Sequence, residues 1–598
     1  MKPSPYAFLL LLALLSACTG APRYANEPRL RRQDVSANRT RVEPKVVERC
    51  SRNPDGDVNC RSESIFIGVA ISGGGSRAAN FSAAVLSELD AIGLLRHVNA
   101  ISSVSGGSLT AAYLAKNWEQ VSYSSDFWGK AKRDLSQDFR SAFVRKTFRP
   151  DNFMASMFGS LGRTELMAKV FDDMVFQGAK FRDLGPSGFS LLMNATAINN
   201  IYGVEHLDRC TNRQGNATSM RWESVPFSSD FFNQCLHSTL DSYPISRAVS
   251  ASAAFPGVYS SVPLGVFDPV DSNKADPSMP GQFLHLIDGG PSDNLGIEGL
   301  MGPLLTKMGE LKRPTDRCMI VVIDAFGSGD IDRRHRKDDI RSAADRIVDS
   351  NFMDSIDAML YRRREDTLRT LGILFPSMNS SPPVYSGNHF PVEEGYYDYH
   401  GTARISSVSI RQNRDGTFVF LPTTQPASSR PPELAAELEC LIWYIGLDSL
   451  RELVITDWEH FERREIKALS PDTTIKGNTA YKGLSDSTIQ ASLNAYLRTD
   501  RPRRINDAWE LATRVRTDFD LVGPPRCPSR VLADALWITG KTSVNADVTS
   551  RKTICKWLDE TRLSRSMRCD SHEKADIPKL PVKYATSDKW FEYSIECD

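Results

Sequence analysis

The chain has no net charge and no internal repeat. Its 598 residues include 73 lysines and arginines and 73 aspartates and glutamates, so the formal charge is zero. A balanced composition gives no global preference for nucleic acid, and we expect no nucleic-acid partner. The basic runs at residues 333–337 and 362–364 are each followed by acidic residues, and we interpret them as solvated faces.

The N-terminus lacks an apolar run long enough to span a bilayer comfortably. Lys2 precedes an apolar run at residues 6–15, whose length is typical of the hydrophobic region of a signal peptide. The following Leu15-Ser16-Ala17-Cys18 is similar to a bacterial lipobox, a resemblance that implies acylation of Cys18 as the first mature residue. Because Thr19 is not the aspartate associated with inner-membrane retention, we expect a lipid-anchored protein of the bacterial cell envelope. It would sit in the outer membrane, facing the periplasm or the cell surface, whereas a plain signal peptide is the alternative.

Cysteine usage is consistent with an oxidising compartment. Eleven cysteines include Cys18, and the remaining ten are an even number that suits disulfides. Cys50 and Cys60 bracket a short turn, and Cys210 and Cys235 bracket a polar loop, so both are candidate local pairs. The connectivity of six others is left open: Cys318, Cys440, Cys527, Cys555, Cys569 and Cys597. Scattered reduced thiols are the alternative.

Residues 19–63 are rich in Pro, Arg and Glu and have no sustained apolar period, which predicts a flexible tether. Asp55, Asp57 and Asn59 mimic the opening of a calcium loop, but Cys60 and Phe66 occupy its glycine and glutamate positions. We therefore expect no metal site there, and no cofactor elsewhere.

The first segment that suits a catalytic role is Gly73-Gly74-Gly75-Ser76-Arg77. It follows an apolar run at residues 64–71 that predicts a buried strand, and it precedes a predicted helix at residues 78–89. Glycines accept positive φ and expose bare N–H groups, while the helix N-terminus adds a positive dipole. The segment thus predicts an oxyanion hole built from backbone. A plain glycine turn or a phosphate loop is the alternative, although the P-loop ending and the full Gly-x-Gly-x-x-Gly spacing are both missing.

The second segment is Ser103-Val104-Ser105-Gly106-Gly107, between a predicted strand at residues 98–104 and a predicted helix at residues 108–115. Small neighbours at a strand-to-helix corner are what a nucleophile elbow requires, and they indicate Ser105 as the nucleophile. Ser103 stands where the usual motif has its first glycine. A small-residue turn with a capping serine is the alternative.

The third segment is the apolar run at residues 283–287 followed by Asp288-Gly289-Gly290. Functional residues of open α/β sheets gather at the carboxyl ends of strands, which favours Asp288 as a functional carboxylate over an ordinary Asp-Gly turn. Nucleophile, activating group and oxyanion donors together are the requirements of acyl transfer.

These three segments, in this order, resemble the patatin-like phospholipases, relatives of the cytosolic phospholipase A2 catalytic domain. Residues 251–256, Ala-Ser-Ala-Ala-Phe-Pro, add to the resemblance, which covers residues 64–330 and extends more weakly to about residue 430. It implies an α/β fold with a three-layer α/β/α core and a mostly parallel central sheet. It also implies a Ser-Asp dyad, with Ser105 as nucleophile and Asp288 as general base. The oxyanion donors would be amides of the glycine segment, braced by Arg77, although Ala78 replaces the glycine that often follows this arginine.

A Ser-His-Asp triad is the competing mechanism. His285 lies three residues before Asp288, an odd offset that places it on the opposite face of a strand. His389 and His400 fall in a Gly/Tyr-rich region after the predicted core and stay open as partners.

The expected organisation is a signal peptide at residues 1–18, a tether at 19–63, a hydrolase domain at 64–430 and a mainly helical region at 431–598. Within it we expect strands at 190–197 and 319–325, a helix at 347–371, and a hairpin of 406–411 with 417–421. In the last region we expect helices at 484–497 and 506–517.

The resemblance and the anchor together predict a membrane-tethered lipid acyl hydrolase acting on phospholipids or lysophospholipids, with the phospholipid membrane as partner. The alternatives are a broad carboxylesterase or thioesterase, and a non-catalytic envelope lipoprotein that binds proteins.

Overall fold

The computed structural model describes the α/β body of the chain and several segments packed on it. The described residues are 25–28, 44–52, 58–124, 126–157, 162–184, 188–199, 223–267, 280–302, 304, 317–327, 351–373, 405–412, 418–422, 436–447, 509, 511–513, 515–517, 519–521, 529–545 and 548–560. Cys18, the signal peptide, His389, His400 and residues 484–497 lie outside them.

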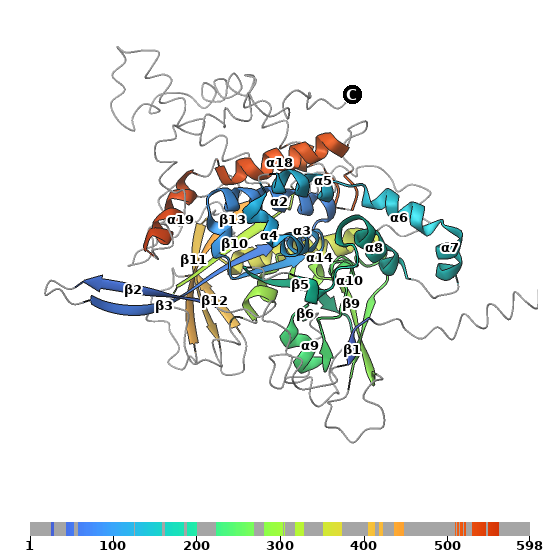
Figure 1. Cartoon of the computed structure of the whole chain (residues 1–598), viewed down its shortest axis with the longest axis horizontal. Coiled ribbons are helices and arrows are strands. Elements are labelled where there is room, and N and C mark those ends of the chain that lie inside the picture. The colour runs from blue at the N-terminus through green and yellow to red at the C-terminus, as the bar shows by residue number, and fades with distance from the viewer. Residues whose placement is uncertain are drawn as a thin grey trace, which may run out of the picture.

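A large mixed sheet forms the centre of the molecule (Figure 1). Within the described residues it has 11 strands in the order β12-β11-β13-β10-β3-β4-β5-β9-β8, with β2 added on β3 and β6 on β5. The run from β13 to β5 is parallel, and the flanking strands are antiparallel. The strands are β2 (Lys45–Arg52), β3 (Val58–Ile71), β4 (Ala100–Val104), β5 (Ser190–Ala197), β6 (Glu223–Pro226), β8 (Val262–Val266), β9 (Gln282–Asp288), β10 (Arg317–Asp324), β11 (Ile405–Gln412), β12 (Phe418–Pro422) and β13 (Ala436–Gly446).

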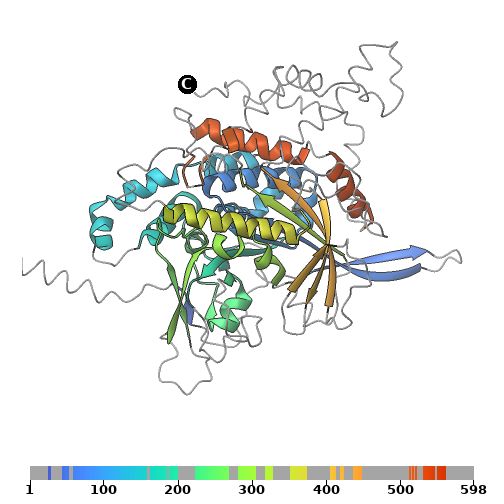
Figure 2. The same ribbon diagram turned by 180° about the vertical axis from the view of Figure 1, so that it is seen from behind.

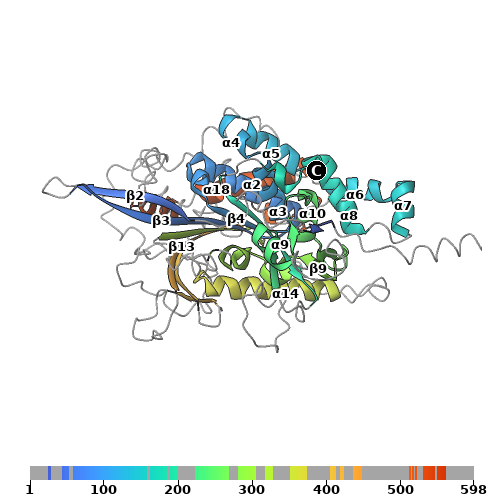
Figure 3. The ribbon, with the colours of Figure 1, turned by 60° about the horizontal axis from the view of Figure 1, so that its bottom comes forward.

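Both faces of the sheet are buried, because side chains alternate between two apolar clusters. Along β3, Ile67 and Val69 belong to one cluster, whereas Phe66 and Ala70 belong to the other. The first cluster is covered by α2 (Gly75–Ala91), α3 (Gly106–Lys116) and α18 (Ser529–Asn545). The second is covered by residues 295–304 and by the last turns of α14 (Asn351–Thr370), which Figures 2 and 3 show on the opposite side of the sheet. The three-layer α/β/α architecture is therefore confirmed.

Shorter helical elements complete the described part of the chain. They are η1 (Leu94–His97), α4 (Trp118–Tyr123), α5 (Phe127–Leu135), α6 (Phe139–Thr147), α7 (Pro150–Met157), α8 (Arg163–Phe171), η2 (Asp172–Phe176), η3 (Phe181–Asp183), α9 (Ser229–Cys235), α10 (Ile245–Ser252), α11 (Gly290–Asp293) and α19 (Val548–Glu560). A separate two-stranded sheet pairs β1 (Glu27–Pro28) with β7 (Ser238–Thr239).

The structure corrects two boundaries drawn from the sequence. The predicted tether ends early, because β2 pairs antiparallel with the first part of β3 and forms a long hairpin. The central sheet also continues past residue 430: β13, inside the region expected to be mainly helical, pairs with both β10 and β11. A disulfide between the buried Cys318 and Cys440 joins β10 to β13, so this strand is an integral part of the core.

The other disulfide predictions are only partly visible. Cys50 and Cys60 are backbone partners in the register of the β2–β3 hairpin. Cys235 is disulfide-bonded, whereas its expected partner Cys210 lies outside the described residues.

Candidate active site

Ser105 sits at a sharp corner between β4 and α3. Its φ is 50° and its ψ is −119°, an unusual conformation for a residue other than glycine and one that commonly marks a functional site. The corner needs glycine after it, because a Cβ on Gly106 would lie 1.9 Å from the carbonyl oxygen of Gly75. A Cβ on Gly107 would lie 2.7 Å from the carbonyl oxygen of Ser72. The elbow and the glycine segment are therefore packed backbone against backbone.

A serine from a distant helix fixes the backbone of this corner. The Ser105 amide donates a 2.9 Å hydrogen bond to Oγ of Ser252, at the end of α10. The Ser252 hydroxyl donates in turn to the carbonyl of Asn194 on β5 at 2.6 Å. Its Oγ also lies 2.9 Å from Oγ of Ser108, which bonds to Ser103 at 3.1 Å. Ser103 thus contributes its hydroxyl to a buried network at the position where the usual motif has glycine.

Asp288 ends β9 and lies beside the elbow. It pairs with Ala195 in β5, while the preceding residue of β5, Asn194, pairs with Val104 at the end of β4. The carboxylate of Asp288 accepts hydrogen bonds from the Gly290 amide at 2.8 Å and from the Ser105 side chain. The candidate nucleophile and the candidate base therefore lie within hydrogen-bonding reach of each other.

Burial changes the acidity of this carboxyl group. Asp288 is 4% exposed, and its removal from water raises its pKa from 3.8 to about 6, although its two hydrogen bonds act in the opposite direction. A carboxylate with a pKa near 6 is a better base at neutral pH than an ordinary aspartate.

The segment after α10 holds the base as well as the nucleophile. The Asp288 amide donates to the carbonyl of Ala254 at 2.9 Å, and the Gly289 amide donates to the carbonyl of Ser252 at 3.1 Å. Residues 252–254 therefore bridge the two catalytic candidates. The resemblance had pointed to residues 251–256 without a role, and no local signal in the sequence identifies these contacts.

The glycine segment approaches Ser105 closely, and its backbone amides differ in whether they already have an acceptor. The Gly73 amide donates to the carbonyl of Asn294 at 3.0 Å and is thus occupied, while its Cα faces the nucleophile. Gly74 has a φ of 136° and Gly75 a φ of 57°, so both need glycine's freedom at the start of α2. The amides of Gly74, Gly75 and Ser76 belong to the cap and first turn of α2, where the helix itself supplies no acceptor. These three amides are the candidate oxyanion donors.

Arg77 is almost completely buried, and its side chain bonds to the C-terminal region. Its Nη1 donates to the carbonyl of Val515 at 3.0 Å. Arg77 therefore attaches part of the C-terminal region to the first turn of α2.

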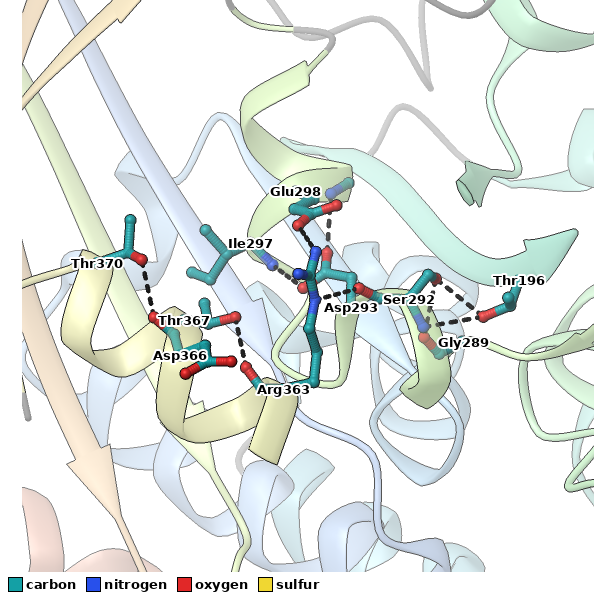
Figure 4. Close-up of polar contacts among 11 residues, drawn as sticks. Thr196, Gly289, Ser292, Asp293, Ile297, Glu298, Arg363, Asp366, Thr367 and Thr370 are labelled. Carbon is teal, nitrogen blue, oxygen red and sulfur yellow. Dashed lines mark hydrogen bonds and ion pairs between the residues drawn. The ribbon is translucent and has the colours of Figure 1, made fainter. Parts of the chain in front are cut away.

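A second polar network fixes the turn that follows Asp288 (Figure 4). Both carboxylate oxygens of Asp293 accept backbone amides, from Ile297 at 3.0 Å and Gly299 at 2.9 Å. Burial and the nearby Glu298 raise the pKa of Asp293. Arg363 of α14 donates to the Ser292 carbonyl at 3.0 Å and pairs with Glu298.

The neighbouring Arg364 is buried, so the solvated face expected at residues 362–364 is wrong at this position. Its Nε donates to Asp324 at 2.6 Å and its Nη2 to the Tyr444 hydroxyl at 2.9 Å. This ion pair lies at the carboxyl end of β10. The glycine segment is next to that end of the strand, because the Ser72 amide donates to the Ile323 carbonyl at 2.9 Å.

Among the described residues we looked for a catalytic histidine, a metal site and a membrane-spanning helix. His285 lies on β9 with its side chain on the face opposite that of Leu284 and Leu286, the face shared by even offsets from Asp288. In the described part of the chain, no group of histidine, cysteine and carboxylate side chains is arranged to hold a metal ion. No described helix combines the length and the hydrophobicity that crossing a bilayer requires.

An α/β/α sandwich with a serine at a strand-to-helix elbow and a buried carboxylate beside it has the geometry of a serine hydrolase. Residues 69–301, less than half of the chain, match the family model described as patatin-like phospholipase. The match supports lipid acyl hydrolase activity. A search of curated proteins found no match.

Among solved structures, similarity is weak. Human GIVD cytosolic phospholipase A2 is 13% identical over 84% of this chain and 60% of its own length, with a TM-score of 0.38. The same human enzyme in complex with methyl gamma-linolenyl fluorophosphonate is 12% identical over 84% of this chain and 70% of its own, with a TM-score of 0.31. VipD from Legionella pneumophila is 12% identical over 86% of this chain and 97% of its own, with a TM-score of 0.21. The family assignment rests on the sequence match.

Proposed function

We propose that the chain is a membrane-tethered serine acyl hydrolase that releases fatty acids from phospholipids or lysophospholipids. The observation that carries the proposal is the contact between Ser105, held in a strained elbow, and the buried Asp288, whose pKa is raised to about 6. The phospholipid substrate class follows from the family match and from the predicted lipid anchor at Cys18.

In the proposed reaction, Ser105 Oγ attacks the ester carbonyl carbon while Asp288 accepts the hydroxyl proton. The amides of Gly74, Gly75 and Ser76 stabilise the negative charge that develops on the carbonyl oxygen. The tetrahedral intermediate collapses as the ester C–O bond breaks, and Asp288 returns the proton to the leaving alcohol. Water then attacks the acyl-serine, with Asp288 taking its proton, and the cycle ends when the fatty acid leaves and Ser105 regains its hydrogen.

The proposed location is the bacterial cell envelope. Acylation at Cys18 would hold the domain on the outer membrane, facing the periplasm or the cell surface, and would bring the site to its substrate. Retention of labelled palmitate by the wild-type chain, and its absence in a Cys18→Ser variant, tests this part separately.

The decisive experiment measures fatty-acid release from mixed phospholipid vesicles by the chain beginning at residue 19, as wild type, Ser105→Ala and Asp288→Asn. This start removes none of the described residues. Loss of activity in both variants supports the dyad, whereas activity in Asp288→Asn redirects the search to histidines outside the described residues. Hydrolysis of soluble esters without action on vesicles would favour a carboxylesterase or thioesterase. A wild type that neither hydrolyses esters nor reacts with a fluorophosphonate probe would favour a non-catalytic lipoprotein.

A further inference from the structure

Exposed apolar side chains gather on one projecting part of the molecule. Among the described residues, nine large apolar side chains are substantially exposed, and four of them lie within residues 144–154. We call these four the α6–α7 patch: Val144, Phe148, Phe153 and Met154. Phe148 is 70% exposed and Met154 is 50% exposed. Figures 1 and 3 show α6 and α7 projecting from the body at the end opposite the β2–β3 hairpin.

Packing within the chain does not account for this patch. Phe139 and Phe143, four residues apart, form the inward stripe of α6: Phe139 contacts Phe171 at a ring distance of 5.3 Å, and Phe143 contacts Tyr259 at 5.9 Å. Val144 and Phe148 repeat the same spacing on another face of the helix and stay exposed. A surface helix needs one apolar stripe to dock on its own core, so the second stripe is available to something else.

The turn between the helices is firmly held. The side chain of Asn152, on α7, is buried and donates to the Lys146 carbonyl at 2.9 Å, and the Thr147 hydroxyl donates to the Phe143 carbonyl at 2.8 Å. The four apolar side chains are thus presented by a preformed surface.

The charge around the patch has one dominant sign. Residues 139–157, which span α6 and α7, contain four basic side chains and one acidic side chain, while Asp138 precedes α6 and Asp172 follows α8. The nearby acids Asp151, Glu165 and Asp173 are each paired with a basic residue, respectively Arg149, Arg247 and Lys146. The exposed Arg145 and Lys169 have no acidic partner among the described residues. An apolar patch with a basic surround is complementary to a surface that is apolar inside and negative outside.

The patch is connected to the candidate active site by a short piece of chain. The segment after α10 starts at Ser252, which holds the Ser105 amide, and continues to Tyr259, which contacts α6. Arg163 donates to the Gly257 carbonyl at 3.3 Å, and Thr164 donates to the Ser260 carbonyl, so α8 is fastened to the same segment. The seven residue steps from 252 to 259 span at most about 25 Å, so this segment joins α6 to the candidate site over a short length of chain.

We propose that the α6–α7 patch docks the protein on the surface of an anionic phospholipid bilayer. Val144, Phe148, Phe153 and Met154 enter the interfacial region, and the surrounding arginines and lysines contact the negative head groups. The role of this docking rests on the proposed function: docking would place a lipid acyl hydrolase against its substrate.

The test measures binding, so it does not depend on catalysis. The chain beginning at residue 19 is sedimented with ether-linked phosphatidylcholine vesicles, with and without ether-linked phosphatidylglycerol. The variants are Phe148→Ser/Phe153→Ser and Arg145→Glu/Lys169→Glu, and the control is Tyr123→Ser, which removes an exposed aromatic outside the patch. Turnover of a soluble monomeric ester is measured in parallel for all chains.

We expect the aromatic double variant to bind at least about tenfold more weakly, because full burial of one phenylalanine contributes at least about a factor of ten and the two side chains are each only partly exposed before docking. The charge variant should lose the preference for phosphatidylglycerol, and wild-type binding should weaken with salt. Tyr123→Ser should bind like wild type, and soluble-ester turnover should be unchanged throughout.

Equal vesicle binding by wild type and the aromatic variant would overturn the proposal. Equal binding together with a change from dimer to monomer in sedimentation would instead assign the patch to a second copy of the chain. If the wild type binds vesicles through the patch but hydrolyses nothing, the docking inference survives and the proposed function fails.

Discussion

Replacing Asp288 by asparagine should inactivate the protein and stabilise it at the same time. The carboxyl group is buried, and its pKa rises from 3.8 to about 6 on folding. This difference corresponds to about 3 kcal/mol, since each pKa unit is worth about 1.4 kcal/mol. Asparagine cannot ionise, so the variant avoids the cost of a buried negative charge while keeping an oxygen that accepts the Gly290 amide.

The direction of the pH dependence follows from proton binding. The folded chain binds the Asp288 proton more tightly than the unfolded chain, so this residue costs nothing below about pH 3.8. The cost grows as the pH rises and is complete above about pH 6. We therefore expect Asp288→Asn to exceed wild type in unfolding free energy by about 3 kcal/mol at pH 8 and by about half of that at pH 5.

Urea unfolding at several pH values, together with initial rates on a soluble ester, provides the measurement. Wild-type kcat/KM should fall as the pH drops through about 6, because protonated Asp288 cannot act as a base. Ser105→Ala is the matched control: it should be equally inactive but retains the ionisable carboxyl group, so its stability should still fall as the pH rises, at least as steeply as in wild type, because Ser105 no longer lowers the pKa of Asp288. An Asp288→Asn variant no more stable than wild type at pH 8 would refute the reasoning.

Three further substitutions test how the site is supported. Ser252→Ala removes the acceptor of the nucleophile's amide and should cost about 1–3 kcal/mol of stability, with a loss of kcat, by urea unfolding and ester turnover. Ser250→Ala, on the same helix and with no hydrogen-bond partner for its buried hydroxyl among the described residues, should change neither. Gly106→Ala should abolish fluorophosphonate labelling because its Cβ would collide with the glycine segment, whereas Gly281→Ala, whose Cβ would meet no atom of the described residues within 4 Å, should label normally. Arg364→Met should cost about 3–5 kcal/mol in urea unfolding, because it leaves a buried carboxylate without its cation.

The local structure of the candidate catalytic segments could be predicted because each is a local pattern. An apolar strand, a turn of small residues and a helix start are adjacent in sequence at both Gly73 and Ser105, and their types follow from backbone sterics and periodicity. The contact of Ser252 with Ser105 joins residues 147 positions apart, and a buried serine looks the same in sequence whether or not it has a partner.

The two corrected boundaries have different physical causes. The β2–β3 hairpin extends beyond the apolar core, so backbone pairing defines it and its side chains show no apolar period. In β13, the apolar run Leu441-Ile442-Trp443-Tyr444-Ile445 does carry a signal, but a short run that is buried on both faces does not distinguish a strand from a helix. Only its pairing with β10 decides the matter.

The segment from Ser252 to Ser260 connects the candidate site to the proposed docking face, and its bonding indicates what docking does. The Ser252 hydroxyl already accepts the Ser105 amide and donates to the Asn194 carbonyl, and the Ala254 carbonyl already holds the Asp288 amide. The candidate catalytic groups are therefore in place without a bilayer, so docking should concentrate and orient substrate without assembling the site. Turnover of a soluble monomeric ester should accordingly be the same with and without ether-linked anionic vesicles, while release from ester-linked vesicles depends on Phe148 and Phe153. A several-fold rise in soluble-ester turnover when vesicles are added would show instead that the segment transmits a conformational change from the membrane to the site.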